Sequence, residues 1–573
     1  MKNYKHNEYY KKLVKCFYID NKVNLTFSLL SSILLCVLNI ITAFLFKGLA
    51  DVATNGTIEN LIKLILFSLL FLLLYVFVSM FKRKFLSKFI EKALVMYKKL
   101  VFSSVLSKDI NAFNDETTSR YTSILTNDIT SIESSFILGK IQIINNIFLL
   151  VIGLLAMLYL NWLLTICILI STIIPLVVVA FFSGKLSECE VQVSNKNEVY
   201  VGIMNSIFTG FPVIKSFKAE QQILANYEKN NKTLEMIKRK RRETANLINI
   251  SSFSSSFLVT VVACGVGAYL SIIGQETIGT VIAFIQLLDY VVNPIQELGP
   301  SIANIKASSQ LIEKVANAIC ENTSHQESKI NYSSFNDKIV FDNVNFSYSD
   351  NKEVLRNINL IIEKGKSYAI VGLSGSGKTT ILNMLLGYHD TYKGSIKLDS
   401  HEIKDVKSSC LYEIITVIQQ SVYIFDDTIK ENITMSKPFD DDLVNRAIEN
   451  AGLSDLINEK GITYLCGENG KNLSGGEKQR IAIARALMNR SSVMLVDEAT
   501  ASLDNITSQK VINSILDLKD ITRIVVTHKI NNQDLSRFDK IIVMKNGEIV
   551  DVGEFNDLYE KKSYFYSLIN VSE

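Results

Sequence analysis

Charged side chains are missing from four long stretches of this sequence, at residues 23–46, 64–81, 141–184 and 244–275. Hydrophobic residues make up 48% of the 573 residues, and the mean hydropathy is +0.22. One or two soluble cores need fewer apolar side chains than this. The composition therefore excludes an ordinary soluble enzyme, and we expect the excess apolar residues to lie in lipid.

The sequence also lacks the cysteine spacing of disulfide frameworks and metal sites, although it contains 8 cysteines. Several of them, such as Cys36 and Cys264, lie inside apolar stretches, which is typical of small buried hydrophobic residues. The net charge of +3 is too small to indicate a nucleic-acid partner. No short apolar core with a small-residue cleavage site precedes Val23, so a cleaved signal peptide is not predicted.

The charge-free stretches predict six membrane-spanning helices. A helix needs ~20 mostly apolar residues to cross ~30 Å of hydrocarbon, so the shorter stretches are single spans. Residues 141–184 are long enough for two spans, with Asn161 and Trp162 as a short turn and interfacial anchor between them. After them, we expect a fifth span that ends at about Leu270 and a sixth span from Thr277 to about Gln296. A turn at Gly274-Gln275-Glu276 separates these two spans.

Lysine and arginine lie almost entirely on one side of these spans. Six Lys precede the first span, ten Lys and Arg lie in residues 82–140, and eleven lie in residues 185–242. The connections on the other side hold only Lys47 and Lys63. Because basic residues are retained in the cytoplasm, we expect both termini and both long connections there. Richness in Lys, Asn and Ile suggests an AT-rich bacterial genome and hence the plasma (inner) membrane of a bacterium.

The chain changes character along its length, which predicts four segments. Residues 1–22 are basic and aromatic, which suits a helix on the inner membrane surface. Residues 23–315 form the six-span membrane domain with two long intracellular loops, and residues 316–337 are a polar linker. In residues 338–573, strand-like runs alternate with helix-like runs. The predicted fold is therefore a membrane helical bundle followed by an α/β domain.

Three short apolar runs in this last segment are predicted to be buried parallel strands. They are rich in β-branched residues and each ends in polar residues: Ser367–Val371, Val493–Val496 and Ile524–Val526. Ligand-binding loops typically leave the C-terminal ends of such strands. Asn546-Gly547, between two further runs, predicts a hairpin turn.

A phosphate-binding loop follows the first of these strands. Gly372-Leu373-Ser374-Gly375-Ser376-Gly377-Lys378-Thr379 matches the full P-loop pattern between a predicted strand and a helix-like run. Its glycines let successive N–H groups point at phosphate oxygens. Lys378 is expected to reach the β- and γ-phosphates, and the Thr379 hydroxyl to bind Mg²⁺.

A second motif follows the strand Val493–Val496, which runs into Asp497-Glu498. An Asp at such a strand end can hold Mg²⁺, and the next carboxylate can polarise the attacking water. Taken alone, this pair is more often a solvated strand end. Together with the P-loop, it predicts the catalytic end of a nucleotide hydrolase.

Further motifs follow in the order found in ATP-binding cassette (ABC) proteins, and Leu473-Ser474-Gly475-Gly476-Glu477 resembles their signature. The other matching positions are Tyr348, Gln420, Ser502-Leu503-Asp504 and Thr527-His528. The chain as a whole resembles the ABC exporter half-transporters of the multidrug, lipid and peptide export group. This resemblance implies a membrane helical bundle of six spans followed by an α/β P-loop ATPase domain of ABC type.

The resemblance also implies roles. Tyr348 stacks on adenine, Glu498 is the general base, His528 stabilises the transferring phosphoryl group, and Gln420 senses Mg²⁺ and the water. Gln419 could be mistaken for Gln420, but the spacing to Phe425 favours Gln420. The implied metal ligands are Thr379, Gln420 and Asp497. The implied ATP-binding set is Tyr348, Gly372, Ser374, Gly375, Ser376, Gly377, Lys378, Thr379, Thr380, Ser474, Gly475, Gly476, Glu477 and Asp504.

One chain supplies half of the usual twelve spans and one of two ATP sites, so the resemblance implies a dimer closed head to tail. A second copy of the chain is the simpler partner, and a related half-transporter is the alternative. The expected function is ATP-driven export of a hydrophobic or amphipathic molecule: a drug-like compound, a lipid or a peptide. A nucleotide-gated channel or regulatory membrane ATPase is the alternative of a different class.

Polar residues recur along one face of the predicted sixth span: Gln286, Asp289, Tyr290, Asn293 and Glu297. Asp289 lies ~18 Å along the helix from Thr277, inside the hydrocarbon thickness, where a carboxylate is costly unless it faces water or a partner. Our hypothesis is that Asp289 contacts positively charged cargo. A structural role remains the alternative, with Asp289 paired to a neighbouring helix or in the cytoplasmic end of a tilted span.

Overall fold

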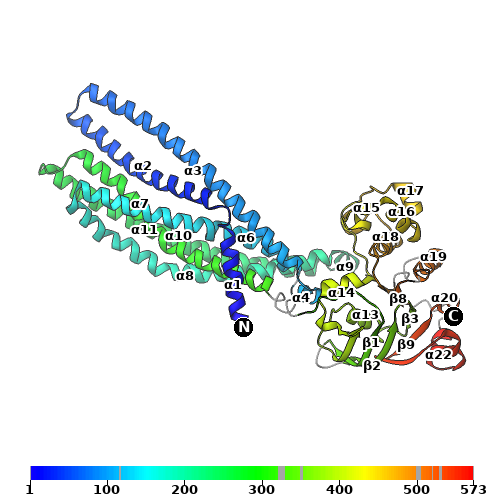
Figure 1. Cartoon of the computed structure of the whole chain (residues 1–573). Coiled ribbons are helices and arrows are strands. Elements are labelled where there is room, and N and C mark those ends of the chain that lie inside the picture. Colours follow the sequence, from blue (N-terminus) through cyan, green and yellow to red (C-terminus); the bar gives the residue numbers. More distant parts are fainter. Residues whose placement is uncertain are drawn as a thin grey trace. The chain divides into compact units, whose positions relative to one another are not determined.

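The computed structural model describes residues 2–114, 116, 118–320, 329–348, 353–498, 505–518, 520–527 and 532–571. The chain divides into two compact units, and Figure 1 traces the elements of each. The first, helical unit comprises Met1–Ser107 and Glu116–Glu321. The second unit, here called the cassette, comprises Lys108–Asp115 and Asn322–Glu573.

The helical unit consists of α1 Lys2–Cys16, α2 Lys22–Asn55, α3 Ile58–Leu106, α5 Thr118–Leu125, α6 Asn127–Ser131, a π-helical segment Ile132–Ile137, α7 Leu138–Leu160, α8 Trp162–Thr209, α9 Phe211–Ser216, α10 Glu220–Ile272 and α11 Ile278–Cys320. α3, α10 and α11 have 49, 53 and 43 residues. A membrane crossing needs only ~20 residues, so each of these helices extends well beyond a single span.

In the described residues, five helical segments are long and apolar enough to cross a membrane: Lys22–Thr54, Ile58–Leu106, Arg120–Leu160, Glu220–Ile272 and Ile278–Ile319. The remaining predicted span falls in α8, whose described apolar part, Trp162–Ile174, is shorter. The prediction of a multi-span helical domain is therefore confirmed, whereas the number six is not.

The two predicted turns between spans are present. α7 ends at Leu160, and the Asn161 side chain caps α8 by accepting a hydrogen bond from the Leu164 N–H at 2.9 Å. The Asn161 amide also donates to Glu276 at 2.7 Å, in the turn between α10 and α11. Gly274 adopts a φ of +75° in that turn, which a glycine tolerates without strain.

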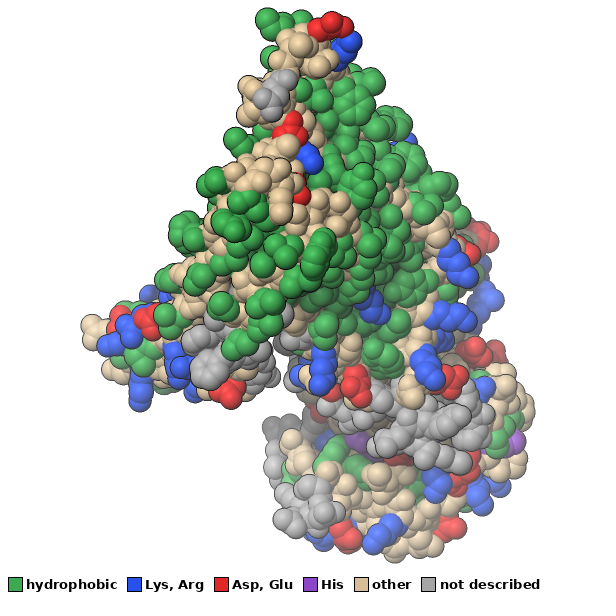
Figure 2. All heavy atoms as spheres, turned by 90° about the vertical axis from the view of Figure 1, so that its left-hand side faces the viewer, with side chains coloured by type: hydrophobic (Ala, Val, Ile, Leu, Met, Phe, Trp, Pro, Cys, Tyr) green, Lys and Arg blue, Asp and Glu red, His purple; other side chains and the backbone are tan. Residues whose placement is uncertain are grey.

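Apolar side chains cover much of the surface of this unit, as Figure 2 shows. On α3 they include Leu66, Leu70, Leu73 and Phe77, which are all more than half exposed. The interior face of the bundle is instead tightly packed, with Phe284, Leu287 and Val291 of α11 fully buried. Exposed apolar surface of this extent suits helices that lie in lipid.

The cassette consists of α4 Ile110–Asn114, β1 Lys338–Ser347, β2 Glu353–Glu363, β3 Ser367–Val371, α13 Lys378–Leu385, β4 Lys393–Leu398, β5 His401–Glu402, a 3₁₀ turn Ile403–Asp405, α14 Ser408–Ile414, β6 Ile415–Ile418, α15 Ile429–Thr434, α16 Asp441–Asn450, α17 Ser454–Lys460, a 3₁₀ turn Glu468–Gly470, α18 Gly475–Met488, β7 Val493–Asp497, α19 Asn505–Leu516, β8 Thr522–Val526, α20 Asn532–Leu535, β9 Lys540–Lys545, β10 Glu548–Gly553, α21 Phe555–Glu560 and α22 Tyr564–Val571.

Two sheets organise the cassette. The larger has the strand order β10-β9-β3-β8-β7-β6, and all neighbours in it are parallel except β10 and β9. The smaller, antiparallel sheet has the order β2-β1-β4-β5. The three predicted parallel strands are confirmed as the buried neighbours β3, β8 and β7. The predicted hairpin joins β9 to β10, with positive φ at both Asn546 and Gly547.

Candidate functional site

The phosphate-binding loop links the buried strand β3 to α13. Gly372 and Gly377 have φ angles of +155° and +102°. A Cβ atom on Gly372 would lie 2.4 Å from the Met544 carbonyl oxygen, so a larger residue does not fit there. Gly377 precedes Lys378, the first residue of α13, so the loop ends at a helix N-terminus, where backbone N–H groups favour phosphate.

Lys378 is buried inside this loop. Its amine donates hydrogen bonds to the carbonyl oxygens of Gly372 and Leu373, each at 2.9 Å. Burial lowers the pKa of Lys378, and the carboxylates of Glu498 and Asp497 act in the opposite direction. The amine is therefore held at the loop by neutral carbonyl acceptors. The phosphates of a nucleotide can take the place of these carbonyls and form stronger, charge-assisted hydrogen bonds with the amine.

A buried polar atom in the same loop lacks a hydrogen-bond partner among the described residues. Ser376 is 4% exposed, and its Oγ has no such partner there. Buried hydroxyl groups are nearly always hydrogen-bonded, so an orphan of this kind calls for an explanation. A bound phosphate at the loop would supply the missing partner.

Two oxygen ligands suited to Mg²⁺ lie beside the loop. The Thr379 hydroxyl donates to Oδ1 of Asp497 at 3.3 Å, and Asp497 is the last residue of β7. Mg²⁺ is usually held by one or two carboxylates together with waters and substrate phosphates. The residues present therefore fit this metal. Among the described residues, no group of three His, Cys, Asp or Glu side chains forms a separate metal site.

The Glu498 carboxylate is oriented by Gln420. Parallel pairing of β6 with β7 places Ile418 opposite Val496, so the residues that follow each strand are close. Nε2 of Gln420 donates to Oε2 of Glu498 at 2.8 Å. The Glu498 N–H in turn donates to the Val526 carbonyl at 3.1 Å, and its φ is +50°. The structure thus brings Gln420, rather than Gln419, to the carboxylate.

Tyr348 belongs to a cluster of three aromatic rings. The His389 ring stacks on Phe346 at 4.8 Å and meets Tyr348 edge-on at 5.2 Å. The Tyr348 hydroxyl lies 3.2 Å from the hydroxyl of Thr380, the second residue of α13 after Lys378. Tyr348 is 58% exposed, so its ring is available to a base. Sequence reasoning missed His389, because no motif marks it.

The signature residues begin α18. Ser474 is the N-cap residue, and it forms a capping box with Glu477: the Ser474 N–H donates to the Glu477 carboxylate at 2.7 Å. Gly475 and Gly476 therefore lie in the first turn of a helix of 14 residues. Figure 1 shows α18 grouped with α15, α16 and α17, apart from α13. The chain does not bring its own signature to its own phosphate loop.

Two predicted residues, His528 and Asp504, lie outside the described residues. The strand that leads toward His528 is nevertheless in place. β8 ends at Val526, which pairs with Asp497 of β7. The chain after β8 therefore starts beside the two carboxylates of the site.

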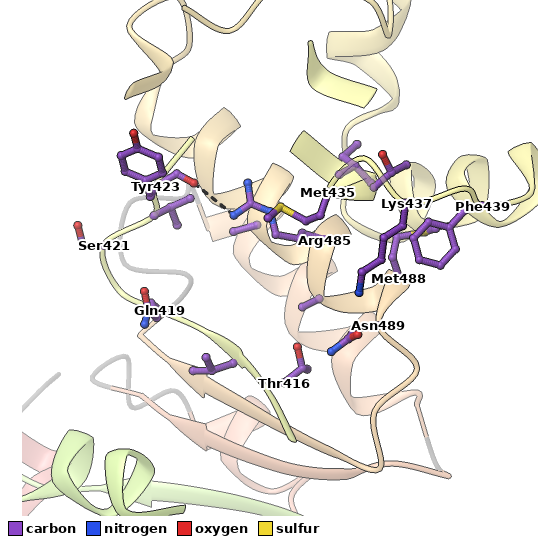
Figure 3. A pocket seen from close by; sticks show the side chains of 16 residues that line it. Thr416, Gln419, Ser421, Tyr423, Met435, Lys437, Phe439, Arg485, Met488 and Asn489 are labelled. Atoms are coloured by element: carbon purple, nitrogen blue, oxygen red, sulfur yellow. Dashed lines mark hydrogen bonds between the residues drawn. The ribbon is translucent and has the colours of Figure 1, made fainter. Parts of the chain in front are cut away.

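A groove of about 370 Å³ lies between α18 and the segment that comprises β6 and the residues after it, and Figure 3 shows its lining. Gln419, Tyr423, Met435 and Arg485 are among its residues. Arg485 of α18 donates to the Tyr423 carbonyl at 3.2 Å and to the Asn432 carbonyl at 2.8 Å. One guanidinium therefore ties the segment that follows Gln420 to the helix that carries the signature.

The predicted polar residues of the sixth span lie on α11. Asp289 and Asn293 are exposed, and Gln286 is half-buried. Glu297 accepts hydrogen bonds from the amides of Gln142 and Asn146 on α7, each at 3.0 Å. The cargo role of Asp289 stays a prediction.

Comparison with known proteins agrees with this geometry. The family described as ABC transporter transmembrane region matches residues 25–295, and the family described as ABC transporter matches residues 355–501. Two relatives, from Staphylococcus aureus strains NCTC 8325 and COL, are each 30% identical over 496 residues, which are 84% of this chain and of the relative. Both are provisionally named multidrug export ATP-binding/permease proteins.

A solved structure of a bacterial Atm1-family ABC exporter with ATP bound has the same fold, with a TM-score of 0.84. It is 21% identical, and the match covers 96% of this chain and 98% of that chain. The chain described here therefore belongs to the ABC transporter family, with the transmembrane region and the ATP-binding domain fused in one polypeptide.

Proposed function

We propose that this chain exports a hydrophobic or amphipathic molecule, namely a drug-like compound, a lipid or a peptide, using the energy of ATP hydrolysis. The observation that supports this most directly is the meeting of Lys378, Asp497, Glu498 and Gln420 at one sheet edge, in a chain that also carries long apolar helices. ATP hydrolysis coupled to transport is the activity of its family.

ATP would bind with its base against Tyr348 and its phosphates on the loop. The N–H groups of Gly375 to Lys378 and the orphaned Ser376 hydroxyl would hold the phosphates, and Lys378 would reach toward the γ-phosphate. Thr379, Asp497 and Gln420 would hold Mg²⁺, which when bound neutralises developing phosphate charge.

Glu498 would accept the proton of the attacking water, and Gln420 would fix the orientation of its carboxylate through the 2.8 Å hydrogen bond. His528 would stabilise the phosphoryl group during transfer. Arg485 would link this chemistry to the signature helix, because it binds the segment directly after Gln420. Movement of that helix would then change the position of Gln420.

The site would be completed by the partner in a dimer. Within one chain the signature at the start of α18 lies apart from the phosphate loop, although its helix N-terminus is suited to bind a phosphate. Ser474 and the amides of Gly475 and Gly476 would therefore hold the γ-phosphate of ATP bound to the partner chain, and Asp504 would contribute to the same ATP site. We propose a homodimer, with the six spans of each chain in the plasma membrane and both termini in the cytoplasm.

A nucleotide-gated channel with the same fold is the competing proposal. The two differ in whether ATP moves cargo against its gradient. The purified protein in liposomes, with cassettes outward, should accumulate a labelled amphipathic compound above its external concentration when ATP is added. Equilibration without accumulation would favour the channel.

A further inference from the structure

A polar cavity of about 370 Å³ lies within the helical unit. Eight of its lining residues are polar: Ser134, Ser135, Gln142, Asn249, Gln296, Glu297, Ser301 and Asn304. Ile248, Pro300 and Gly139 add a small apolar wall. The volume falls in the range of small-molecule sites, which is ~300–1,000 Å³.

The cavity extends the polar face of α11 beyond Asp289. Gln296, Glu297, Pro300, Ser301 and Asn304 follow one another at helical spacing and contribute the α11 wall. Asp289 is not among the lining residues. The carboxylate that faces this cavity is therefore that of Glu297. The hypothesis from the sequence singled out Asp289, another residue of the same polar face.

Glu297 is the one ionisable residue among the described residues that line the cavity. Its Oε2 accepts both amide bonds from α7, from Gln142 and Asn146. No Lys or Arg of the described residues forms an ion pair with it. Two neutral donors orient a carboxylate, but they do not neutralise its charge.

Glu297 lies near the inner end of the membrane-spanning part of α11, and its side chain is exposed rather than buried. Counting from Ile278 at about 1.5 Å per residue, Glu297 lies ~28 Å along α11. A span of this depth reaches the inner edge of a hydrocarbon layer ~30 Å thick. Ionisable groups in membrane-spanning helices usually face the bundle interior or a wet cavity, and they pair with a partner there.

We infer that this cavity binds cargo that carries a single cationic group, such as a protonated amine, on an apolar body, and that Glu297 is its counter-ion. This inference rests on the proposed function of the chain as an exporter. The cation pairs with Glu297, the surrounding hydroxyl and amide groups complete its hydrogen bonds, and the apolar body contacts Ile248 and Pro300.

Binding can be measured with the full-length protein in lipid nanodiscs. The probes are dansylcadaverine, which carries one primary ammonium group, and its N-acetylated form, which has the same fluorophore without the charge. Wild-type protein should bind the amine at least ~10-fold more tightly than the acetylated form, because only the amine can form a charge-assisted hydrogen bond with the Glu297 carboxylate. Glu297→Gln should remove this preference. The surface variant Glu59→Gln, at an exposed ion pair with Lys63, should keep it.

A second variant covers the case in which Glu297→Gln does not fold. Ser301→Lys keeps Glu297 and places a cation inside the cavity, so it should lose binding of the amine. The inference is overturned if Glu297→Gln keeps the preference for the amine, or if Ser301→Lys binds the amine like wild type.

Transport separates this inference from the proposed function. If ATP drives uptake of other compounds into liposomes while amine binding does not depend on Glu297, the export proposal stands and the Glu297 inference is wrong. If the amine binds in a Glu297-dependent manner but ATP never drives its accumulation, the binding site stands and the export proposal is wrong.

Discussion

The side-chain amide of Gln420 donates a hydrogen bond to Oε2 of Glu498 over 2.8 Å. Gln420 lies two residues after the end of β6, and Glu498 directly follows the neighbouring strand β7. This bond connects the proposed general base to the segment that Arg485 anchors on α18. The position of the Glu498 carboxylate therefore depends on the contact that Arg485 of α18 makes with the segment after β6.

Replacing Gln420 with Ala should lower the ATPase rate by roughly 10- to 100-fold, because a hydrogen bond to a charged group contributes ~1.5–3 kcal/mol. The KM for ATP should change little, because Tyr348 and Lys378, rather than Gln420, are proposed to hold the adenine and the phosphates. Steady-state ATPase assays on the purified dimer measure both constants.

Gln419→Ala is the matched control, because Gln419 lines the groove of Figure 3 and has no bond to Glu498. Its ATPase rate should stay within about twofold of wild type. A larger loss for Gln419→Ala than for Gln420→Ala would mean that the two glutamines have been assigned in the wrong order.

Lys378→Ala should weaken ATP binding itself. The amine is buried at the phosphate loop and is the cation closest to the expected phosphates among the described residues of that loop. Equilibrium binding of ATP, measured by filter retention of labelled nucleotide, should show a large rise in Kd. Wild-type affinity in this variant would rule out the role of the loop lysine.

His389→Ala should raise the KM for ATP by roughly 2- to 10-fold, because aromatic pairs contribute ~0.5–1.5 kcal/mol and His389 packs against Tyr348 and Phe346. The kcat should change less than the KM. His401→Ala is the control, because the His401 ring packs against Tyr332 instead, in a tilted arrangement. Restoration of the KM by His389→Phe would assign the effect to ring packing, and an unchanged KM in His389→Ala would contradict it.

Mixed dimers test whether each ATP site uses two chains. A Lys378→Ala chain and a Ser474→Arg chain, carrying different tags, should each be inactive as homodimers. The purified mixed dimer should bind and occlude one ATP, because one intact phosphate loop faces one intact signature. A mixed dimer without any occluded nucleotide would indicate that loop and signature act within the same chain.

Local motifs explain why the catalytic part of the site could be predicted from the sequence. The phosphate loop and Asp497-Glu498 each follow a strand, and parallel pairing of β3, β8 and β7 brings those strand ends to one edge. Within the family resemblance, the spacing to Phe425 also favoured Gln420 over Gln419. The strands and the hairpin at Asn546-Gly547 follow from the same local rules.

The parts that sequence reasoning missed depend on packing between distant segments. His389 and Phe346 are brought together only by folding, and Arg485 reaches Asn432 across 53 residues. Helical periodicity grouped Asp289 with Glu297. The position of α7, whose Gln142 and Asn146 donate hydrogen bonds to Glu297, decides which carboxylate faces the cavity. Hydrophobic runs likewise marked the apolar part of each span, but not the polar extensions of α3 and α10.

The most direct test of ATP-driven function is Glu498→Gln, measured for ATP binding and phosphate release on the same sample. The amide can still hydrogen-bond to the water but cannot accept its proton, so we expect wild-type ATP binding with hydrolysis reduced ~10²- to 10⁴-fold. Glu363→Gln, at an exposed ion pair with Lys366, should hydrolyse ATP like wild type. Retention of more than half of the wild-type rate by Glu498→Gln would contradict the account.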